Sequence, residues 1–275
     1  MKINDIIELN ELLDEAWYDK KNLIGAATAL GIGAGAASLA PTSDIPNSAP
    51  GYQPEIHMDL EHEKSEPKKE PSAEEKFHSE VQGLEPKDVK KKFIQVVLPS
   101  IKEVNDEIRQ ERLQVIEALK AKPRSAEQNM FLNSMFQKYK VQDQNPKELL
   151  QKVDIIPEPI ALAQAGLESH WGTSRLAKEA NVLYGQKTTA KDAAHSETDA
   201  YAKFGGFKDA IRSYAKNLNT HDAYDGFREV RYKQRANGKL NPNELVHALG
   251  KYSTKGKGYI RTLLKVMNHN KNDLK

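Results

Sequence analysis

The 275-residue chain has no cysteine. This absence excludes a disulfide scaffold, a structural zinc site with cysteine ligands, an iron–sulfur cluster and a thiol nucleophile. Aromatic residues make up only 7% of the chain. The spacings His-x-x-x-His and His-Glu-x-x-His, which hold zinc on a helix, do not occur. We therefore expect a protein that works with no metal ion and no cofactor.

Each end of the chain is poor in charge of one sign. Residues 1–85 carry 7 basic and 17 acidic side chains, whereas residues 201–275 carry 16 basic and 6 acidic ones. A basic C-terminal region favours an anionic partner, either nucleic acid or an anionic cell-wall polymer. Because no nucleic-acid-binding motif accompanies the charge, we expect no nucleic-acid partner.

The N-terminal region divides into three segments. Residues 1–22 have apolar side chains at helical spacing, which predicts a short amphipathic helix. Residues 23–40 carry no charge and are rich in alanine and glycine, so they are either a membrane anchor or export signal, or a flexible linker. Residues 41–85 are rich in proline, glutamate and lysine, which predicts a disordered linker.

Residues 86–275 are expected to form the folded domain, because regular helical periodicity begins there. Apolar residues on both sides of Pro99 predict a long helix that this proline interrupts. Between Gly185 and Phe204 the pattern favours a small β-hairpin with a polar turn over residues 191–196. The fold class is therefore mainly α with one hairpin lobe. Further helices are expected over 126–139, 160–171, 174–180, 207–218, 224–236, 243–249 and 258–268.

The most informative segment runs from Glu168 to Gly185. It reads E-S-H-W-G-T-S-R-L-A and, after three residues, N-V-L-Y-G. This pattern resembles the glucosaminidase domain of peptidoglycan hydrolases, glycoside hydrolase family seventy-three. The later motifs Ser213-Tyr214, Asn217 to His221, Lys251 to Ser253 and Gly258 to Ile260 resemble the Bax-like branch of that family. The resemblance covers about residues 86–270.

The resemblance implies a lysozyme-like helical domain that cleaves the β-1,4 bond after N-acetylglucosamine in peptidoglycan, and a monomer. It also implies that Glu168 is the catalytic acid and that Tyr252 lines the cleft opposite this acid. Substrate contacts are expected from five residues: Trp171, Tyr184, Tyr214, Asn219 and Tyr252. For Trp171, packing is expected to be the main role and lining of the cleft a secondary one.

The chemistry expected of Glu168 also follows from its position. Glycine at position 172 signals the end of a helix, so Glu168 lies in the last helical turn. The helix dipole and desolvation by Trp171 both disfavour the ionised carboxylate there. A carboxyl that stays protonated near neutral pH can donate a proton to a glycosidic oxygen.

A second carboxylate is expected in the hairpin, where Asp192, Glu197 and Asp199 are candidates and Glu197 is chosen. An N-acetyl group of the substrate could replace it. His221 is expected to start a helix through a hydrogen bond rather than to bind a metal ion.

Two other functions remain open. One is a lytic transglycosylase, and the other is a non-enzymatic glycan-binding component of an envelope or virion. The expected location is the bacterial cell envelope or periplasm, with a membrane contact through residues 23–40, or alternatively a phage particle or lysis system.

Overall fold

The computed structural model describes residues 70–187, 193–195 and 200–273. Those from Pro71 onward lie within one compact unit. The sequence predictions for residues 1–69 lie outside the described residues. The helices are α3 (Ala73–Glu80), α4 (Pro86–Lys120), α5 (Ala126–Lys138), α6 (Pro146–Lys152), α7 (Glu158–Ser169), α8 (Arg175–Ala180), α9 (Phe207–Thr220), η1 (Asp222–Tyr224), α10 (Asp225–Ala236), α11 (Pro242–Leu245), η2 (Val246–Leu249) and α12 (Lys257–His269).

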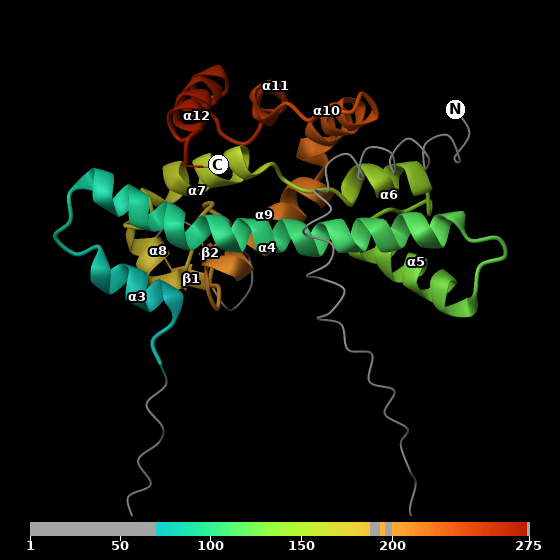
Figure 1. Cartoon of the computed structure of the whole chain (residues 1–275), viewed down its shortest axis with the longest axis horizontal. Helices are drawn as coiled ribbons and strands as arrows, with labels where there is room; N and C mark the ends of the chain where they lie inside the picture. Colours follow the sequence, from blue (N-terminus) through green and yellow to red (C-terminus); the bar gives the residue numbers. More distant parts are fainter. Residues whose placement is uncertain (1–69, 188–192, 196–199, 274–275) are drawn as a thin grey trace, which may run out of the picture. The chain divides into compact units, whose positions relative to one another are not determined.

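Helix α4 connects two hydrophobic cores (Figure 1). Its first half packs with α3, α7, α9 and α12 in the larger core, and its last turns pack with α5 and α6 in the smaller one. The predicted interruption at Pro99 is wrong, because α4 is continuous through this residue. Pro99 is exposed, whereas Leu98 and Ile101 beside it are buried. Water can therefore satisfy the backbone carbonyl that the proline leaves unpaired, while the buried face keeps its packing.

Helix α3 lies in a segment that the sequence predicts to be disordered, so the folded part begins before residue 86. A capping box starts the helix, since Ser72 accepts a hydrogen bond from the backbone of Glu75 and the Glu75 side chain accepts one from the backbone of Ser72. Phe77 is buried in the larger core. Glu74 accepts a hydrogen bond from the backbone N–H of Phe207 at 2.8 Å and so caps α9. These contacts fix α3 on the domain.

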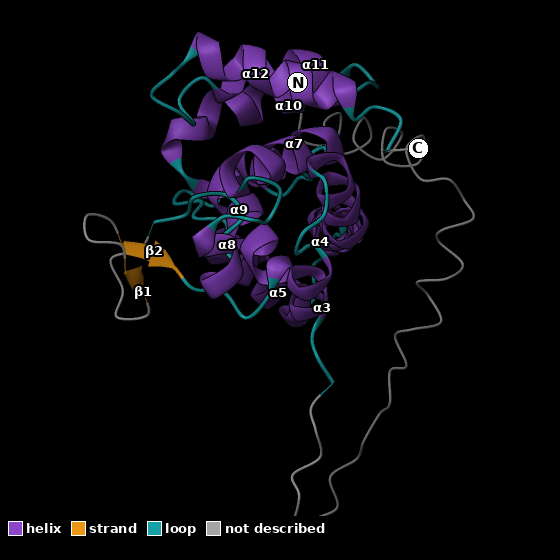
Figure 2. Ribbon diagram, turned by 90° about the vertical axis from the view of Figure 1, so that its left-hand side faces the viewer, coloured by secondary structure: helices purple, strands orange, loops and turns teal. Residues whose placement is uncertain are grey.

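The expected hairpin is present, with strands β1 (Ala193–His195) and β2 (Ala200–Ala202) paired antiparallel. Strand β1 occupies part of the range expected to be a turn, and residues 196–199 between the strands lie outside the described residues. Figure 2 shows the two strands projecting from the helices. The chain after β2 returns to α8, where the Asn181 side chain donates to the carbonyl of Phe204 at 3.0 Å.

Helices α10, α11 and α12 form a layer on one side of α7 and α9 (Figures 1 and 2). The prediction of a mainly helical domain with a small hairpin is confirmed. The range 243–249 is split between a short α-helix and a 3₁₀ turn, and α6 is an additional helix that the sequence patterns did not predict. No helix within the described ranges has the length and apolar character needed to cross a membrane.

Candidate active site

Helix α7 places Glu168 at its exposed C-terminal end, as expected. Three consecutive residues with left-handed backbone follow, namely His170 (φ 51°), Trp171 (φ 55°) and Gly172 (φ 76°). The buried hydroxyl of Ser169 donates to the carbonyl of Ala165 at 2.6 Å and accepts from the N–H of Gly172 at 2.8 Å. The turn immediately after Glu168 is therefore fixed from inside the protein.

Trp171 contributes to packing. Its ring covers Gly166 so closely that a Cβ atom at position 166 would lie 2.6 Å from it. The ring also meets Phe93 edge-on, with the centroids 5.7 Å apart. Positions 166 and 168 face nearly opposite sides of a helix with about 3.6 residues per turn. The structure therefore agrees with packing as the main expected role of Trp171, whereas a substrate contact and a role in desolvating Glu168 are not supported.

A chain of hydrogen bonds leads from the core to Glu168. The buried hydroxyl of Tyr214 donates to Gln164 Oε1 at 2.6 Å, and Gln164 Nε2 donates to the hydroxyl oxygen of Tyr259 at 2.9 Å. The Tyr259 hydroxyl in turn lies close enough to the Glu168 carboxyl to lower its pKa, which links this chain to the acid. Gln164 lies one helical turn before Glu168, on the same face of α7. The acid is thus held by α7, α9 and α12 together.

Two further tyrosines from other parts of the sequence pack against the two tyrosines of this hydrogen-bonded chain. Tyr184 stacks on Tyr214 with centroids 3.8 Å apart, and Tyr252 stacks on Tyr259 at 5.8 Å. The Tyr252 hydroxyl donates to the backbone carbonyl of Tyr184 at 3.0 Å. Gly185 follows Tyr184 with a φ of +63°, and a Cβ atom there would lie 4.0 Å from Glu168 Oε2. The N-V-L-Y-G motif therefore runs directly beside the acid.

The environment raises the pKa of Glu168 above its usual value. The main cause is partial desolvation of the carboxyl by the surrounding protein, although the side chain still reaches solvent. The hydrogen bond from Tyr259 and the positive charges of Lys255 and His170 act in the opposite direction but do not cancel this effect. The result is a carboxyl group that is both accessible and more readily protonated than an ordinary glutamate.

Of the five expected substrate contacts, the structure brings Tyr184, Tyr214 and Tyr252 to the acid but buries the first two. Tyr184 is 3% exposed and Tyr214 is 1% exposed, so neither ring presents a face to a sugar. Asn219 is also buried, and its amide is used within the protein, donating to the carbonyl of Asp154 and accepting from Arg231. Tyr252 is half-buried. Direct sugar contacts are therefore not supported for Tyr184, Tyr214 or Asn219.

Gln164 is a site residue that the sequence patterns missed. Tyr259 lies in the family motif Gly258 to Ile260, but the sequence did not predict it to be a site residue. The available signal was spacing, because Gln164 is the one polar residue between Glu158 and Glu168 and stands four positions before the acid. Tyr259 gave no such signal, since its contact with α7 spans 95 positions in the chain.

The second carboxylate stays a prediction, because Glu197, Asp192 and Asp199 all lie outside the described residues. In the part of the chain that is described, no group of histidine, aspartate and glutamate side chains is arranged to hold a metal ion. His221 starts η1, where its Nδ1 accepts a hydrogen bond from the N–H of Ala223 at 3.1 Å.

Comparison with known proteins agrees with this geometry. Residues 144–272, which contain α7, the tyrosines and α12, match the family model Glucosaminidase, described as mannosyl-glycoprotein endo-beta-N-acetylglucosaminidase. These residues are therefore similar to the glucosaminidase family. The glucosaminidase region therefore includes Glu168 together with every residue of the hydrogen-bonded chain.

The chain is also similar to Protein bax of Escherichia coli strain K12, with 35% identity over 179 residues. The matched region is 62% of this chain and 65% of the length of Protein bax. This similarity agrees with the predicted resemblance to the Bax-like branch. No solved structure matches the chain, so the lysozyme-like character of the glucosaminidase domain stays a prediction.

Proposed function

We propose that this protein is a peptidoglycan hydrolase that cleaves the β-1,4 bond after N-acetylglucosamine, with Glu168 as general acid. The observation that carries the proposal is the state of Glu168, which is exposed, has a raised pKa and is held by Tyr259. Glycosidases use a carboxyl group of this kind to protonate the leaving oxygen. The glucosaminidase family match supports the same class of substrate.

In the proposed reaction, the proton moves from Glu168 to the substrate. The neutral Glu168 carboxyl gives its proton to the glycosidic oxygen while the bond between this oxygen and the anomeric carbon breaks. Glu168 then carries a negative charge, which the Tyr259 hydroxyl stabilises by donating a hydrogen bond. The positive charge of Lys255 stabilises the same carboxylate. Water finally completes hydrolysis at the anomeric carbon and restores the proton to Glu168.

The attack on the anomeric carbon requires either a second carboxylate or the N-acetyl group of the substrate. We propose Glu197 as that carboxylate, as inferred from the sequence. Glu197→Gln is then expected to lower the hydrolysis rate more than Asp192→Asn or Asp199→Asn, which are matched controls from the same hairpin. If all three variants keep near-normal rates, the carboxylate model is wrong and substrate-assisted attack replaces it.

The test of the reaction class is the mass of the products released from purified peptidoglycan. Hydrolysis adds one water to each cleaved bond and leaves a reducing N-acetylglucosamine end. A lytic transglycosylase would leave an anhydro-sugar without added water, and a purely glycan-binding protein would release nothing. We further propose that the protein acts in the bacterial cell envelope, where this substrate is found.

A further inference from the structure

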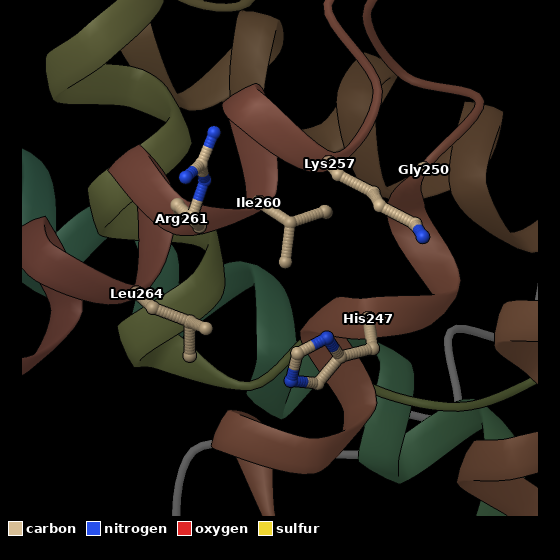
Figure 3. A pocket seen from close by; sticks show the side chains of 6 residues that line it. All are labelled: His247, Gly250, Lys257, Ile260, Arg261 and Leu264. Atoms are coloured by element: carbon tan, nitrogen blue, oxygen red, sulfur yellow. The ribbon is translucent and has the colours of Figure 1, made fainter.

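A pocket lies between η2 and α12, with a volume of about 590 Å³. Figure 3 shows Ile260 at its centre, with Lys257 and Arg261 of α12 on either side and His247 of η2 facing them. Ile260 and Leu264 provide an apolar floor, and Gly250 completes the lining. The pocket thus combines an apolar surface with positively charged side chains.

No ion pair within the described residues neutralises the two cations that line this pocket. Lys257 and Arg261 are exposed, and neither forms an ion pair within the described ranges. They stand four positions apart on α12, where two like charges repel each other. Between Glu244 and Asp273 the chain has six lysine or arginine residues and no aspartate or glutamate. An anionic ligand would relieve this repulsion.

The pocket and the acid share helix α12. Tyr259 extends from α12 toward Gln164 and Glu168, while its neighbour Ile260 forms the floor of the pocket. A helix with its side chains is about 10 Å across. A glycan bound at Glu168 would therefore have to extend a branch by about one helix diameter to reach the pocket.

We propose that this pocket binds the peptide stem of peptidoglycan, and the inference rests on the proposed function. The stem is a short branch of the glycan with small aliphatic side chains and free carboxylates. Its aliphatic groups fit against Ile260 and Leu264, and its carboxylates pair with Lys257 and Arg261. The pocket would thus make the protein select glycan strands that still carry their stems.

The test compares binding of two soluble glycans to the full-length Glu168→Gln variant, which binds without turnover. One glycan carries peptide stems, and the other is the same glycan after an amidase has removed them. We expect the stem-bearing glycan to bind more tightly by a factor on the order of ten, because its carboxylates form two exposed ion pairs with Lys257 and Arg261. The double substitution Lys257→Gln and Arg261→Gln, made in this background, should abolish that preference. Thermal melting confirms that the double variant is folded.

Lys265→Gln is the matched control, because Lys265 is an exposed cation of α12 that does not line the pocket. This control should keep the preference. The inference is overturned if the double variant keeps the preference for the stem-bearing glycan, or if the control loses this preference equally. A third measurement uses poly(glycerol phosphate), an anionic polymer without peptide stems. The inference is also overturned if the double variant loses binding to this polymer instead of the preference for stems. Equal binding of both glycans by the parent protein overturns the stem pocket alone. Failure of the parent to bind either glycan contradicts the proposed function itself.

Discussion

At the scale of single residues, the site depends on a glutamate that is exposed and yet resists ionisation. Glu168 can meet a substrate only because it lies at the end of α7, and its pKa is raised because the protein removes part of its hydration. Gln164 donates a hydrogen bond to the Tyr259 hydroxyl, and this hydroxyl interacts with the carboxyl of Glu168. The accessibility of Glu168 and its proton affinity therefore have different causes, namely its position at the end of α7 and the partial loss of hydration of its carboxyl.

The role of Tyr259 can be measured in the pH dependence of hydrolysis. A hydrogen bond donated to a carboxylate lowers the carboxyl pKa, so Tyr259→Phe should raise the pKa of Glu168 further. Because the acid must be protonated to act, the alkaline limb of the pH–rate profile should move to higher pH. The hydrolysis rate should fall by about tenfold to a thousandfold, because the Glu168 carboxylate that forms on proton transfer is no longer stabilised by the Tyr259 hydroxyl.

Tyr224→Phe is the control for this experiment, because the Tyr224 hydroxyl interacts with Asn217 rather than with Glu168. Its alkaline limb should coincide with that of the unmodified protein. An unshifted limb in Tyr259→Phe would show that Tyr259 does not contact the working acid.

The sequence motif was enough to place Glu168 at the helix end and Asn181 at the left-handed end of α8. It did not give the direction of the Trp171 ring, which depends on the left-handed backbone of His170 and Trp171. Asn219 matched a family motif, but its amide turned out to anchor the chain before α7. Side-chain direction in such turns is set by tertiary packing, which a single sequence does not display.

At the scale of elements, α3 was missed because its composition is that of a linker. Three of its eight residues are glutamates, and Phe77 is its one large apolar residue. That residue is buried beside Phe93, Phe207 and the turn at Gly172, where a Cβ atom would lie 2.8 Å from the Phe77 ring. One aromatic side chain and one capping carboxylate thus secure a helix that hydrophobic periodicity does not reveal.

Truncation separates the contribution of α3 from that of the preceding residues. Removal of residues 1–85 should lower the free energy of unfolding by about 3–5 kcal/mol, the cost of losing a buried phenylalanine. Phe77→Ala in the full chain should lose a similar amount. Removal of residues 1–70 leaves α3 in place and should keep the stability of the domain, as measured by urea unfolding. Equal stability of the two truncated proteins would contradict the docking of α3.

At the scale of the whole domain, a buried charge network fixes the chain that leads into α7. Asp154 is buried and pairs with Arg235, whose Nε donates to Oδ2 at 2.7 Å. Arg231 donates to the carbonyls of Asp154, Ile155 and Gln151 and also to Asn219. Helices α9 and α10, which are far from Glu168 in the sequence, are thereby joined to the segment that precedes α7.

Asp154→Asn tests this network. Burial alone would raise the Asp154 pKa, but Arg235, Arg112 and Arg231 outweigh it and hold the pKa well below its usual value. Loss of the charge leaves buried arginines uncompensated and should cost about 3–5 kcal/mol near neutral pH. Because the folded-state pKa is depressed, this contribution is present above about pH 4 and disappears as the pH falls through the folded-state pKa.

The measurement is chemical unfolding of both proteins at neutral and acidic pH, and the difference should narrow in acid. Asp209→Asn is the control, since Asp209 is exposed in its pair with Arg212 and should change stability by no more than about 1 kcal/mol. A difference between Asp154→Asn and the unmodified protein that is independent of pH would show that charge is not the cause.

The central claim, that Glu168 is the general acid, is tested most directly by the rate at which Glu168→Gln releases fragments from purified peptidoglycan. The amide keeps the shape of the side chain and still accepts a hydrogen bond, but it has no carboxyl proton to give. We predict that the variant melts as a folded protein and still binds the glycan. Its turnover should be slower by about 10²-fold to 10⁴-fold. Turnover at the unmodified rate by the folded variant would contradict the assignment.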